Sequence, residues 1–241
     1  MTRPGNMSES VFITGADKGL GLALTRKFLE EGFLVFAGQY GPAGTLGRLG
    51  EQFPAKLRII PQDVTDPTSI SESARRVAKV SDRLDILINN AGVFFSQTKL
   101  PLAEVDLDDG HLESMMAVNA FGPLRVTRQF LPLLEKGRLK RIVNISSEAG
   151  SISDCGRDSW FGYCMSKAAL NMQCGILQRH LKPKGFKVLA IHPGWLRTDM
   201  GGAEADLDPE VSAEAIFGLA TRKWSLDDPI YMDYTGKPLN W

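Results

Sequence analysis

The feature that most constrains the fold is an alternation of short apolar segments with helical segments along the 241 residues of the chain. The apolar segments are rich in β-branched and aromatic residues, as strands buried on both faces are. We expect strands at 10–14, 33–38, 57–61, 84–92 (with a turn), 141–147, 186–194 and 229–236. Strands of this kind separated by helices form a parallel sheet covered on both sides. The chain is therefore expected to be an α/β protein with a doubly wound sheet of about seven parallel strands.

The expected helices have recognisable beginnings and ends. After the first strand, Leu20, Leu24 and Phe28 mark one helical face, and Gly32 ends that helix. Asp66 and Pro67 supply a cap and a first-turn proline for a helix at 69–80. Further helices are expected at 108–135, from about Phe161 to Leu181, and at 208–220, where Asp208 and Pro209 begin the helix. No second block of composition follows, so residues 1–241 are expected to form one domain with a short disordered N-terminus at 1–8.

Composition excludes several classes of function. Lys and Arg total 28 and so do Asp and Glu, so the net charge is zero and no basic stripe suggests a nucleic-acid partner. No apolar stretch is long enough to span a membrane, and the first ten residues lack the apolar core of a signal peptide. The three cysteines show no CxxC spacing, which favours reduced thiols in the cytoplasm over disulfides or a metal site.

A glycine-rich turn follows the first strand. The sequence TGADKGLG, residues 14–21, places Gly15, Gly19 and Gly21 between a strand and a helix. Glycines there permit a tight turn and close approach of the backbone to a pyrophosphate, and the helix N-terminus offers free N–H groups to the phosphates. The spacing is G-x-x-x-G-x-G, and a glycine-rich turn alone is weak evidence. Its position at the start of a βαβ unit favours dinucleotide binding.

Four further motifs follow in order: NNAG at 89–92, VNAFG at 118–122, NISS at 144–147 and YCMSK at 163–167. With TGADKGLG, they resemble the classical short-chain dehydrogenase/reductase family over nearly the whole chain. The C-terminal stretches HPGWLRTDMGG and DYTGKPLNW resemble the C-factor-like and Sniffer-type carbonyl reductase branch. The resemblance implies a single NAD(P)-binding domain of Rossmann type. It also implies an oxidoreductase that reduces an aldehyde or ketone to an alcohol by hydride transfer.

The resemblance assigns four catalytic residues. Tyr163 would be the general acid–base, and Lys167 would also bind the nicotinamide ribose. Ser147 would donate to the substrate oxygen, and Asn119 would hold a relay water beside Lys167. A phenol is a weak acid, with a pKa of about 10 in water. An ammonium four residues along a helix lies on the same face, and at about 4 Å its charge would lower the pKa of the phenol by up to about 3. The interval from Ser147 to Tyr163 is longer than is commonest in the family, although the Sniffer-type branch shares a long interval.

The resemblance also implies a set of cofactor contacts. Asp63 and Val64 match the adenine contact, although Asp63 could equally cap a turn. Gln39 stands where NAD-preferring members have an acid, and Lys18 matches a basic residue that reaches the 2′-phosphate. We therefore expect NADP(H) to be preferred and NAD(H) to be possible. The full set is Gly15, Asp17, Lys18, Gly19, Leu20, Gln39, Asp63, Val64, Asn90, Ala91, Gly92, Tyr163, Lys167, Pro193, Gly194 and Thr198.

Two functions of different classes remain open. The first is a carbonyl reductase or alcohol dehydrogenase acting on a small molecule. The second is a C-factor-like signalling protein that binds a dinucleotide with little turnover. Residues 200–208 are expected to form either a substrate lid or an ordinary surface loop. A homodimer or homotetramer is expected through the helices at 161–181 and 208–220. Aromatic side chains favour an apolar or aromatic substrate, although core packing explains some of them equally well: Phe94, Phe95, Trp160, Phe161 and Trp195.

Overall fold

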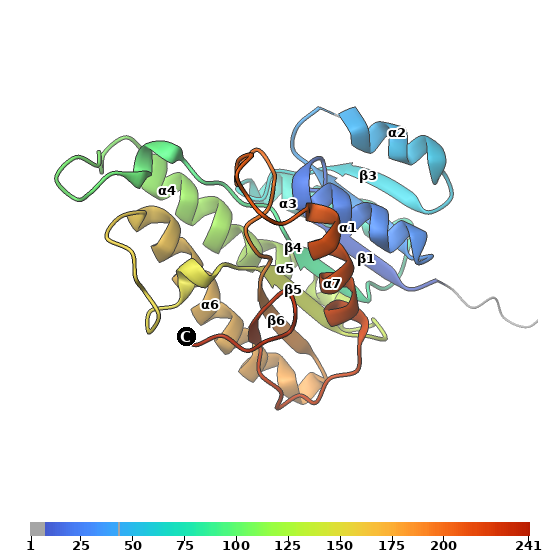
Figure 1. The fold of residues 1–241 in the computed structure, drawn as a ribbon. Coiled ribbons are helices and arrows are strands. Elements are labelled where there is room, and N and C mark those ends of the chain that lie inside the picture. Colours follow the sequence, from blue (N-terminus) through green and yellow to red (C-terminus); the bar gives the residue numbers. More distant parts are fainter. Residues whose placement is uncertain (1–7, 43) are drawn as a thin grey trace, which may run out of the picture.

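The computed structural model describes residues 8–42 and 44–241, and in this part of the chain seven parallel strands form one sheet (Figure 1). Their spatial order is β3-β2-β1-β4-β5-β6-β7. The strands are β1 (Ser10–Ile13), β2 (Leu34–Gln39), β3 (Leu57–Pro61), β4 (Ile86–Asn89), β5 (Arg141–Ile145), β6 (Lys187–His192) and β7 (Tyr231–Asp233). The sequence-based fold class, a doubly wound parallel sheet of Rossmann type, is confirmed. Most of the N-terminus that was expected to be disordered, residues 1–7, lies outside the described residues.

Helices cover both faces of the sheet. They are α1 (Gly19–Glu30), α2 (Gly44–Gln52), α3 (Pro67–Ala78), α4 (His111–Met116), α5 (Gly122–Leu134), α6 (Phe161–Leu181) and α7 (Pro209–Thr221). In Figure 1, α1 and α7 lie in front of the sheet, and α3 and α5 lie behind it. Asp66 and Asp208 cap α3 and α7 through their carboxylates, as their positions before proline predicted.

The sheet separates two apolar cores because alternate residues of each strand point to opposite faces. Val11 and Ile13 of β1 pack with α1, α2 and α7, whereas Phe12 packs with α3, α5 and α6. In β2, Val35 and Phe36 divide in the same way. This burial on both faces explains why the strand segments are apolar throughout.

Two helical features differ from the sequence-based expectation. Helix α2 was not predicted, because glycines recur at every third residue from Gly41 to Gly50 and weaken helix propensity. Burial of Leu46 and Leu49, three residues apart, stabilises it. The helix expected at 108–135 consists of α4, a π-helical turn at Ala117–Phe121, and α5.

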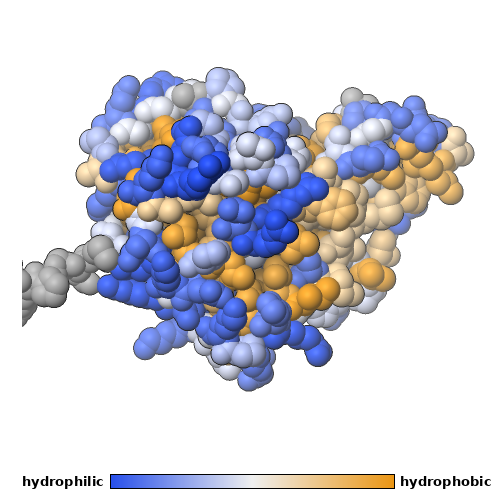
Figure 2. All heavy atoms as spheres, turned by 180° about the vertical axis from the view of Figure 1, so that it is seen from behind, coloured by the Kyte–Doolittle hydropathy of each residue, from blue (hydrophilic) through white to orange (hydrophobic). Residues whose placement is uncertain are grey.

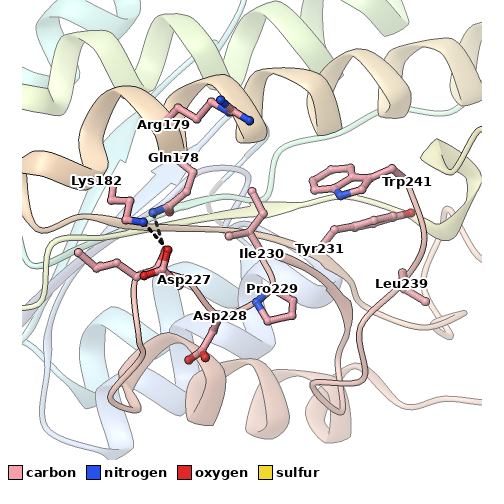
Figure 3. A pocket seen from close by; sticks show the side chains of 11 residues that line it. Gln178, Arg179, Lys182, Asp227, Asp228, Pro229, Ile230, Tyr231, Leu239 and Trp241 are labelled. Carbon is pink, nitrogen blue, oxygen red and sulfur yellow. Dashed lines mark hydrogen bonds and ion pairs between the residues drawn. The ribbon is translucent and has the colours of Figure 1, made fainter.

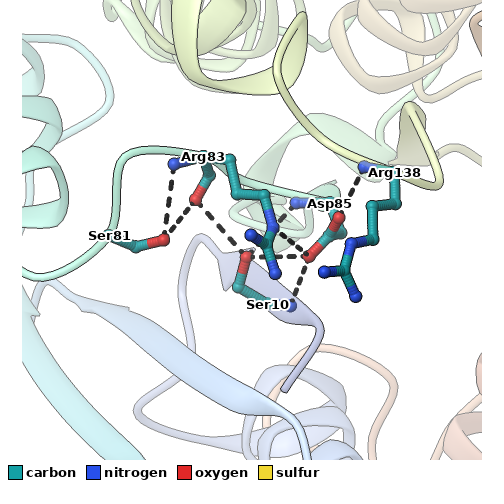
Figure 4. A network of polar contacts seen from close by, with 5 residues as sticks. All are labelled: Ser10, Ser81, Arg83, Asp85 and Arg138. Atoms are coloured by element: carbon teal, nitrogen blue, oxygen red, sulfur yellow. Dashed lines mark hydrogen bonds and ion pairs between the residues drawn. The ribbon is translucent and has the colours of Figure 1, made fainter. Parts of the chain in front are cut away.

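A buried carboxylate ties together the edge of the sheet where the strands begin (Figure 4). Asp85 accepts hydrogen bonds from the Ser10 amide at 2.8 Å and from the Arg138 amide at 2.7 Å. The Ser10 hydroxyl also donates to it, at 3.2 Å. These bonds join β1, β4 and the segment before β5. The polar groups of the candidate site lie at the opposite edge, where the strands end.

None of the helices within residues 8–42 and 44–241 has both the length and the apolar character needed to cross a bilayer.

Candidate active site

The strand ends bring the predicted motifs to one edge of the sheet. β1 leads into the glycine turn, β4 into residues 89–92, and β5 into Ser147. β1 lies between β2 and β4, so the strand order reverses beside the glycine turn. In doubly wound sheets ligands bind at such a switch point, outside the carboxyl ends of the strands.

The three glycines of the glycine turn stand where a side chain would meet neighbouring atoms. Gly15 has φ 61°, and a Cβ there would stand 2.9 Å from the Ala91 Cα. A Cβ on Gly21 would stand 2.0 Å from the Gly15 carbonyl oxygen. Gly19, with φ 52°, lies against Thr198, whose Cγ2 would be 3.2 Å from an added Cβ. Leu20 is buried in the core and anchors the first turn of α1.

Residues 89–92 hold this turn in place. The Asn90 side chain donates to the carbonyl oxygens of Thr14 and Gly15, both at 2.9 Å. The Thr14 hydroxyl accepts from the amides of Asn90 at 3.0 Å and Ala91 at 2.9 Å. Sequence reasoning did not assign a role to Thr14, although it is the first residue of the motif. The two motifs form one unit that shapes the backbone at the expected pyrophosphate position.

Asn119 and Lys167 meet beside Gly92. The Asn119 side chain accepts from the Val93 amide at 2.8 Å and donates to the Val93 carbonyl oxygen at 2.9 Å. A Cβ on Gly92 would be 3.4 Å from Asn119 Oδ1 and 3.9 Å from Lys167 Nζ. The two side chains therefore lie close together, as their assigned roles require, and Asn119 projects from the π-helical turn.

Ser147 follows β5 and begins a short turn that distant segments support. The Ser147 hydroxyl accepts from the Ala149 amide at 3.1 Å. The Tyr231 hydroxyl of β7 donates to the Ser147 carbonyl oxygen at 2.7 Å, and the Trp241 ring stacks on Tyr231 with centroids 5.0 Å apart. Tyr231 was not singled out from the sequence, because a contact across 84 residues leaves no local signal.

Tyr163 and Lys167 project from the first two turns of α6. Lys167 is buried, donates to the Ile145 carbonyl oxygen at 2.9 Å, and has its Nζ 5.6 Å from the centre of the Tyr163 ring. Burial lowers the pKa of Lys167 to about 8. Burial also raises the pKa of Tyr163 to about 12, and a hydrogen bond with Ser147 opposes this only in part.

The expectation that Lys167 lowers the pKa of Tyr163 is therefore wrong for this structure. The cost of burying the phenolate outweighs its attraction to the Lys167 ammonium, so the pKa of Tyr163 rises. The ammonium lies against the ring and donates to a main-chain oxygen. At neutral pH the phenol keeps its proton.

The region where the sequence predicts adenosine binding carries charges of both signs. Gln39 is neutral and donates to the Gly41 carbonyl oxygen at 2.6 Å. Lys18 is exposed and forms an ion pair with Asp199 at 2.9 Å, which raises the pKa of Lys18. Asp17 accepts from the Tyr40 amide at 3.4 Å. The Asp17 carboxylate of the glycine turn thus lies at the end of β2, although the sequence of β2 itself contains no acidic residue there.

Asp63 and Val64 have structural partners of their own. The Asp63 carboxylate accepts from the Thr65 amide at 2.8 Å and from the Thr65 hydroxyl at 2.7 Å, which is the turn-capping alternative. Val64 is buried, and a Cβ on Gly122 would meet it at 3.0 Å. Both residues lie near the edge where the strands end. The Asp63 carboxylate is bonded to Thr65, and the Val64 side chain is packed in the core.

The segment after β6 folds into a compact loop. The Pro193 carbonyl oxygen accepts from the Ser212 hydroxyl at 2.8 Å, and Gly194 has φ 87°. The Thr198 carbonyl oxygen accepts from the Gly202 amide at 2.8 Å. The expected lid, residues 200–208, folds back so that Leu207 pairs with Leu196. Ala205 of this loop is buried.

Aromatic side chains border Tyr163. The Phe94 ring centroid lies 5.2 Å from that of Tyr163, and Trp160 lies 6.4 Å from it. Phe95 instead stacks on His111, and the Trp195 indole donates to the Gly201 carbonyl oxygen. The five aromatic residues expected at the substrate side are thus not one cluster.

A pocket also lies away from these groups, between the end of α6, β7 and the C-terminal tail (Figure 3). Lys182 and Asp227 form an ion pair across it, and Trp241 stands beside Tyr231. None of the site residues expected from the sequence lines this pocket.

Comparisons with known proteins agree with this geometry. A family model described as short chain dehydrogenase matches residues 9–207. C-signal of Myxococcus xanthus is 37% identical over 158 residues, which cover 66% of this chain and 93% of C-signal. The solved NADPH-bound carbonyl reductase from chicken fatty liver is 31% identical with a TM-score of 0.87, covering 97% of this chain and 99% of that one. Carbonyl reductase Sniffer of D. melanogaster is 27% identical with a TM-score of 0.90, covering 97% and 100%. The chain belongs to the short-chain dehydrogenase family, and the resemblance to C-factor-like and Sniffer-type members is confirmed.

Proposed function

We propose that this protein reduces an aldehyde or ketone to an alcohol with a hydride from NADP(H). The observation that carries the proposal is the gathering of Asn119, Ser147, Tyr163 and Lys167 beside the glycine turn, at the edge where the strands end. The similarity to carbonyl reductases of known structure supports the reaction class.

Each of the four side chains has a different role in the reduction of the carbonyl group. The Ser147 hydroxyl donates to that oxygen and polarises the carbonyl bond. Tyr163, which burial keeps protonated at neutral pH, gives its proton to the oxygen as the carbon is reduced. The Lys167 ammonium stabilises the phenolate that results. Asn119 orders the proton path beside Lys167.

The residues of the glycine turn fit a dinucleotide. The absence of Cβ atoms lets the backbone approach a pyrophosphate, and the N-terminus of α1 directs N–H groups toward it. The nicotinamide supplies the hydride when bound. Lys18 favours the 2′-phosphate of NADP(H), as does the neutral Gln39, whereas the Asp17 carboxylate opposes it. We therefore propose a preference for NADPH with measurable use of NADH. One solved relative is described as NADPH bound and another as having bound NADP.

The test is Tyr163→Phe, which keeps the ring and removes only the hydroxyl. The expected loss in kcat is about 2–4 orders of magnitude, the range for a general acid. Affinity for NADPH, measured by fluorescence titration, should stay nearly unchanged and serves as the control for folding. Wild-type turnover by this variant would refute the proposed role of Tyr163.

A second candidate function is a dinucleotide-binding signalling protein, which the 37% identity to C-signal favours. A broad panel of aldehydes, ketones and quinones distinguishes the two functions. Tight NADPH binding without consumption of NADPH with any compound of the panel would favour the signalling protein.

A further inference from the structure

Trp160 has an unusual backbone conformation. With φ 66° and ψ 33° it lies in the left-handed region, and Lys140 is the other non-glycine residue with positive φ in the described part of the chain. A bulky aromatic residue is a genuine outlier there. Such strain persists where the surrounding structure imposes it, and it clusters at ligand sites. Trp160 directly precedes α6, three residues before Tyr163.

The Trp160 ring belongs to an aromatic surface that extends from Tyr163. Phe94 contacts both rings, 5.1 Å from the Trp160 ring and 5.2 Å from the Tyr163 ring, centroid to centroid, and the Trp160 and Tyr163 rings are themselves 6.4 Å apart. A flat ring whose carbonyl group reaches Tyr163 can therefore lie against Phe94 and Trp160. Aromatic pairs at such separations attract beyond the area that they bury.

A lysine lies over two rings of this surface. Lys99 Nζ is 5.3 Å from the Phe94 ring centroid and 5.1 Å from the Trp160 ring centroid. No acidic side chain of the described residues pairs with it. Arg157 also lies over Trp160, at 5.0 Å, but Glu148 neutralises it through two bonds of 2.7 and 2.9 Å. One uncompensated positive charge thus faces the aromatic surface.

The other nearby charges do not cancel that of Lys99. Asp109 is engaged with His111, whose ring stacks on Phe95. The Glu148 carboxylate uses both oxygens on Arg157. A cation over aromatic rings is stabilised by the ring faces and remains able to bind an anion.

We propose that the preferred substrates are flat aromatic carbonyl compounds that carry an anionic group, such as a carboxylate, on the side of the ring away from the carbonyl. The ring lies against Phe94 and Trp160, and the anion meets Lys99. This inference rests on the proposed function, because it names the substrate class of the same site. It makes Lys99 a specificity-determining residue that takes no part in the chemistry.

The experiment compares 4-carboxybenzaldehyde with its methyl ester, which has the same ring and aldehyde but no charge. The kcat/KM of each is measured with saturating NADPH at low ionic strength, in wild type, Lys99→Gln and Lys99→Arg. The ratio of the two values is compared between proteins, since the ester group also changes the reactivity of the aldehyde. Lys79→Gln is the matched control, because Lys79 is exposed and follows α3 at the opposite edge of the sheet.

The ratio of acid to ester should fall about tenfold in Lys99→Gln, the scale of one charge-assisted contact at a partly exposed site. It should persist in Lys99→Arg and Lys79→Gln, and it should shrink in wild type as salt screens the charge. An equal ratio in wild type and Lys99→Gln overturns the substrate proposal and leaves the reductase intact. The substrate proposal is also overturned if the protein reduces other carbonyl compounds but reduces neither 4-carboxybenzaldehyde nor its methyl ester. Failure to reduce any carbonyl compound would instead overturn the proposed function itself.

Discussion

Burial displaces the pKa values of Tyr163 and Lys167 in opposite directions. Burial disfavours the charged form of each group. It therefore raises the pKa of the Tyr163 phenol to about 12 and lowers the pKa of the Lys167 ammonium to about 8. The phenol is therefore protonated at every pH where the protein would be assayed. Lys167 is the group of this pair whose charge changes near neutral pH.

The first consequence at the residue scale is a pH dependence. The folded pKa of Lys167 lies below its ordinary value, so its charge is present at low pH and is lost as the pH rises through about 8. We expect kcat/KM for reduction to fall over that range, because the neutral amine no longer stabilises the phenolate. Lys167→Arg, which does not titrate there, should lose the fall even if its rate is lower. A wild-type profile that stays level up to pH 10 would contradict this.

Cofactor choice is also decided by single residues. A charge-assisted bond from Lys18 to the 2′-phosphate corresponds to about a 10- to 100-fold preference for NADPH. Lys18→Ala should lower the ratio of kcat/KM for NADPH to that for NADH accordingly. The ion pair with Asp199 is exposed and competes only weakly, so Asp199→Asn should raise the NADPH value by at most about fivefold. Asp206→Asn, in the same loop, is the control. An unchanged ratio in Lys18→Ala would remove this lysine from the 2′-phosphate site.

At the scale of elements, burial decided what the sequence could predict. The strands were found because both of their faces are apolar, and α3 and α7 because Asp66 and Asp208 stand before prolines. Helix α2 was missed because it depends on two leucines against the sheet and has weak propensity of its own. The motifs that gather at the strand ends could be found from the sequence, whereas the contact of Tyr231 with Ser147 could not, because only the sheet brings β7 to Ser147. The direction of the Tyr163 shift depended on burial, which local spacing does not reveal.

The loop at 200–208 is the element for which we expect motion. Its ends are fixed by pairing of Leu196 with Leu207 and by the Trp195 indole on Gly201, while Lys18 and Asp199 link its base to the glycine turn. We propose that bound dinucleotide and substrate close the loop over the site. Limited proteolysis should then cut it more slowly with NADPH and a substrate analogue present than without them. Equal cutting rates in both conditions would mark it as an ordinary surface loop.

Over the whole molecule, several apolar side chains remain exposed on the outer faces of the helices that cover the sheet. Helix α6 exposes Met165, Met172 and Ile176, the π-helical turn exposes Phe121, and α5 exposes Leu124. Figure 2 shows the face opposite to that of Figure 1, where apolar surface extends between hydrophilic regions. Helix α7 contributes less than expected, because its apolar residues pack against α1 and the sheet.

We therefore expect a homodimer or homotetramer in which the exposed apolar side chains of α6 are buried against another subunit. Exposed apolar patches of this kind mark interaction surfaces. Light scattering at micromolar concentration gives the molar mass directly. Met172→Glu together with Ile176→Glu should shift the protein toward monomer, because two buried charges would face the partner. A wild-type protein that is strictly monomeric would contradict the expectation.

The π-helical turn at Ala117–Phe121 interrupts the regular α-helical hydrogen bonding between α4 and α5. Such a turn has one residue more than an α-helical turn, so it resembles a single insertion that the surrounding helix absorbed. Deleting Val118 would let α4 and α5 join with regular hydrogen bonds. Both flanks would keep their orientation, but the turn itself would tighten, and the Asn119 amide would no longer meet Val93. A shorter and more regular helix would thus lose the two hydrogen bonds that hold the Asn119 side chain against Val93.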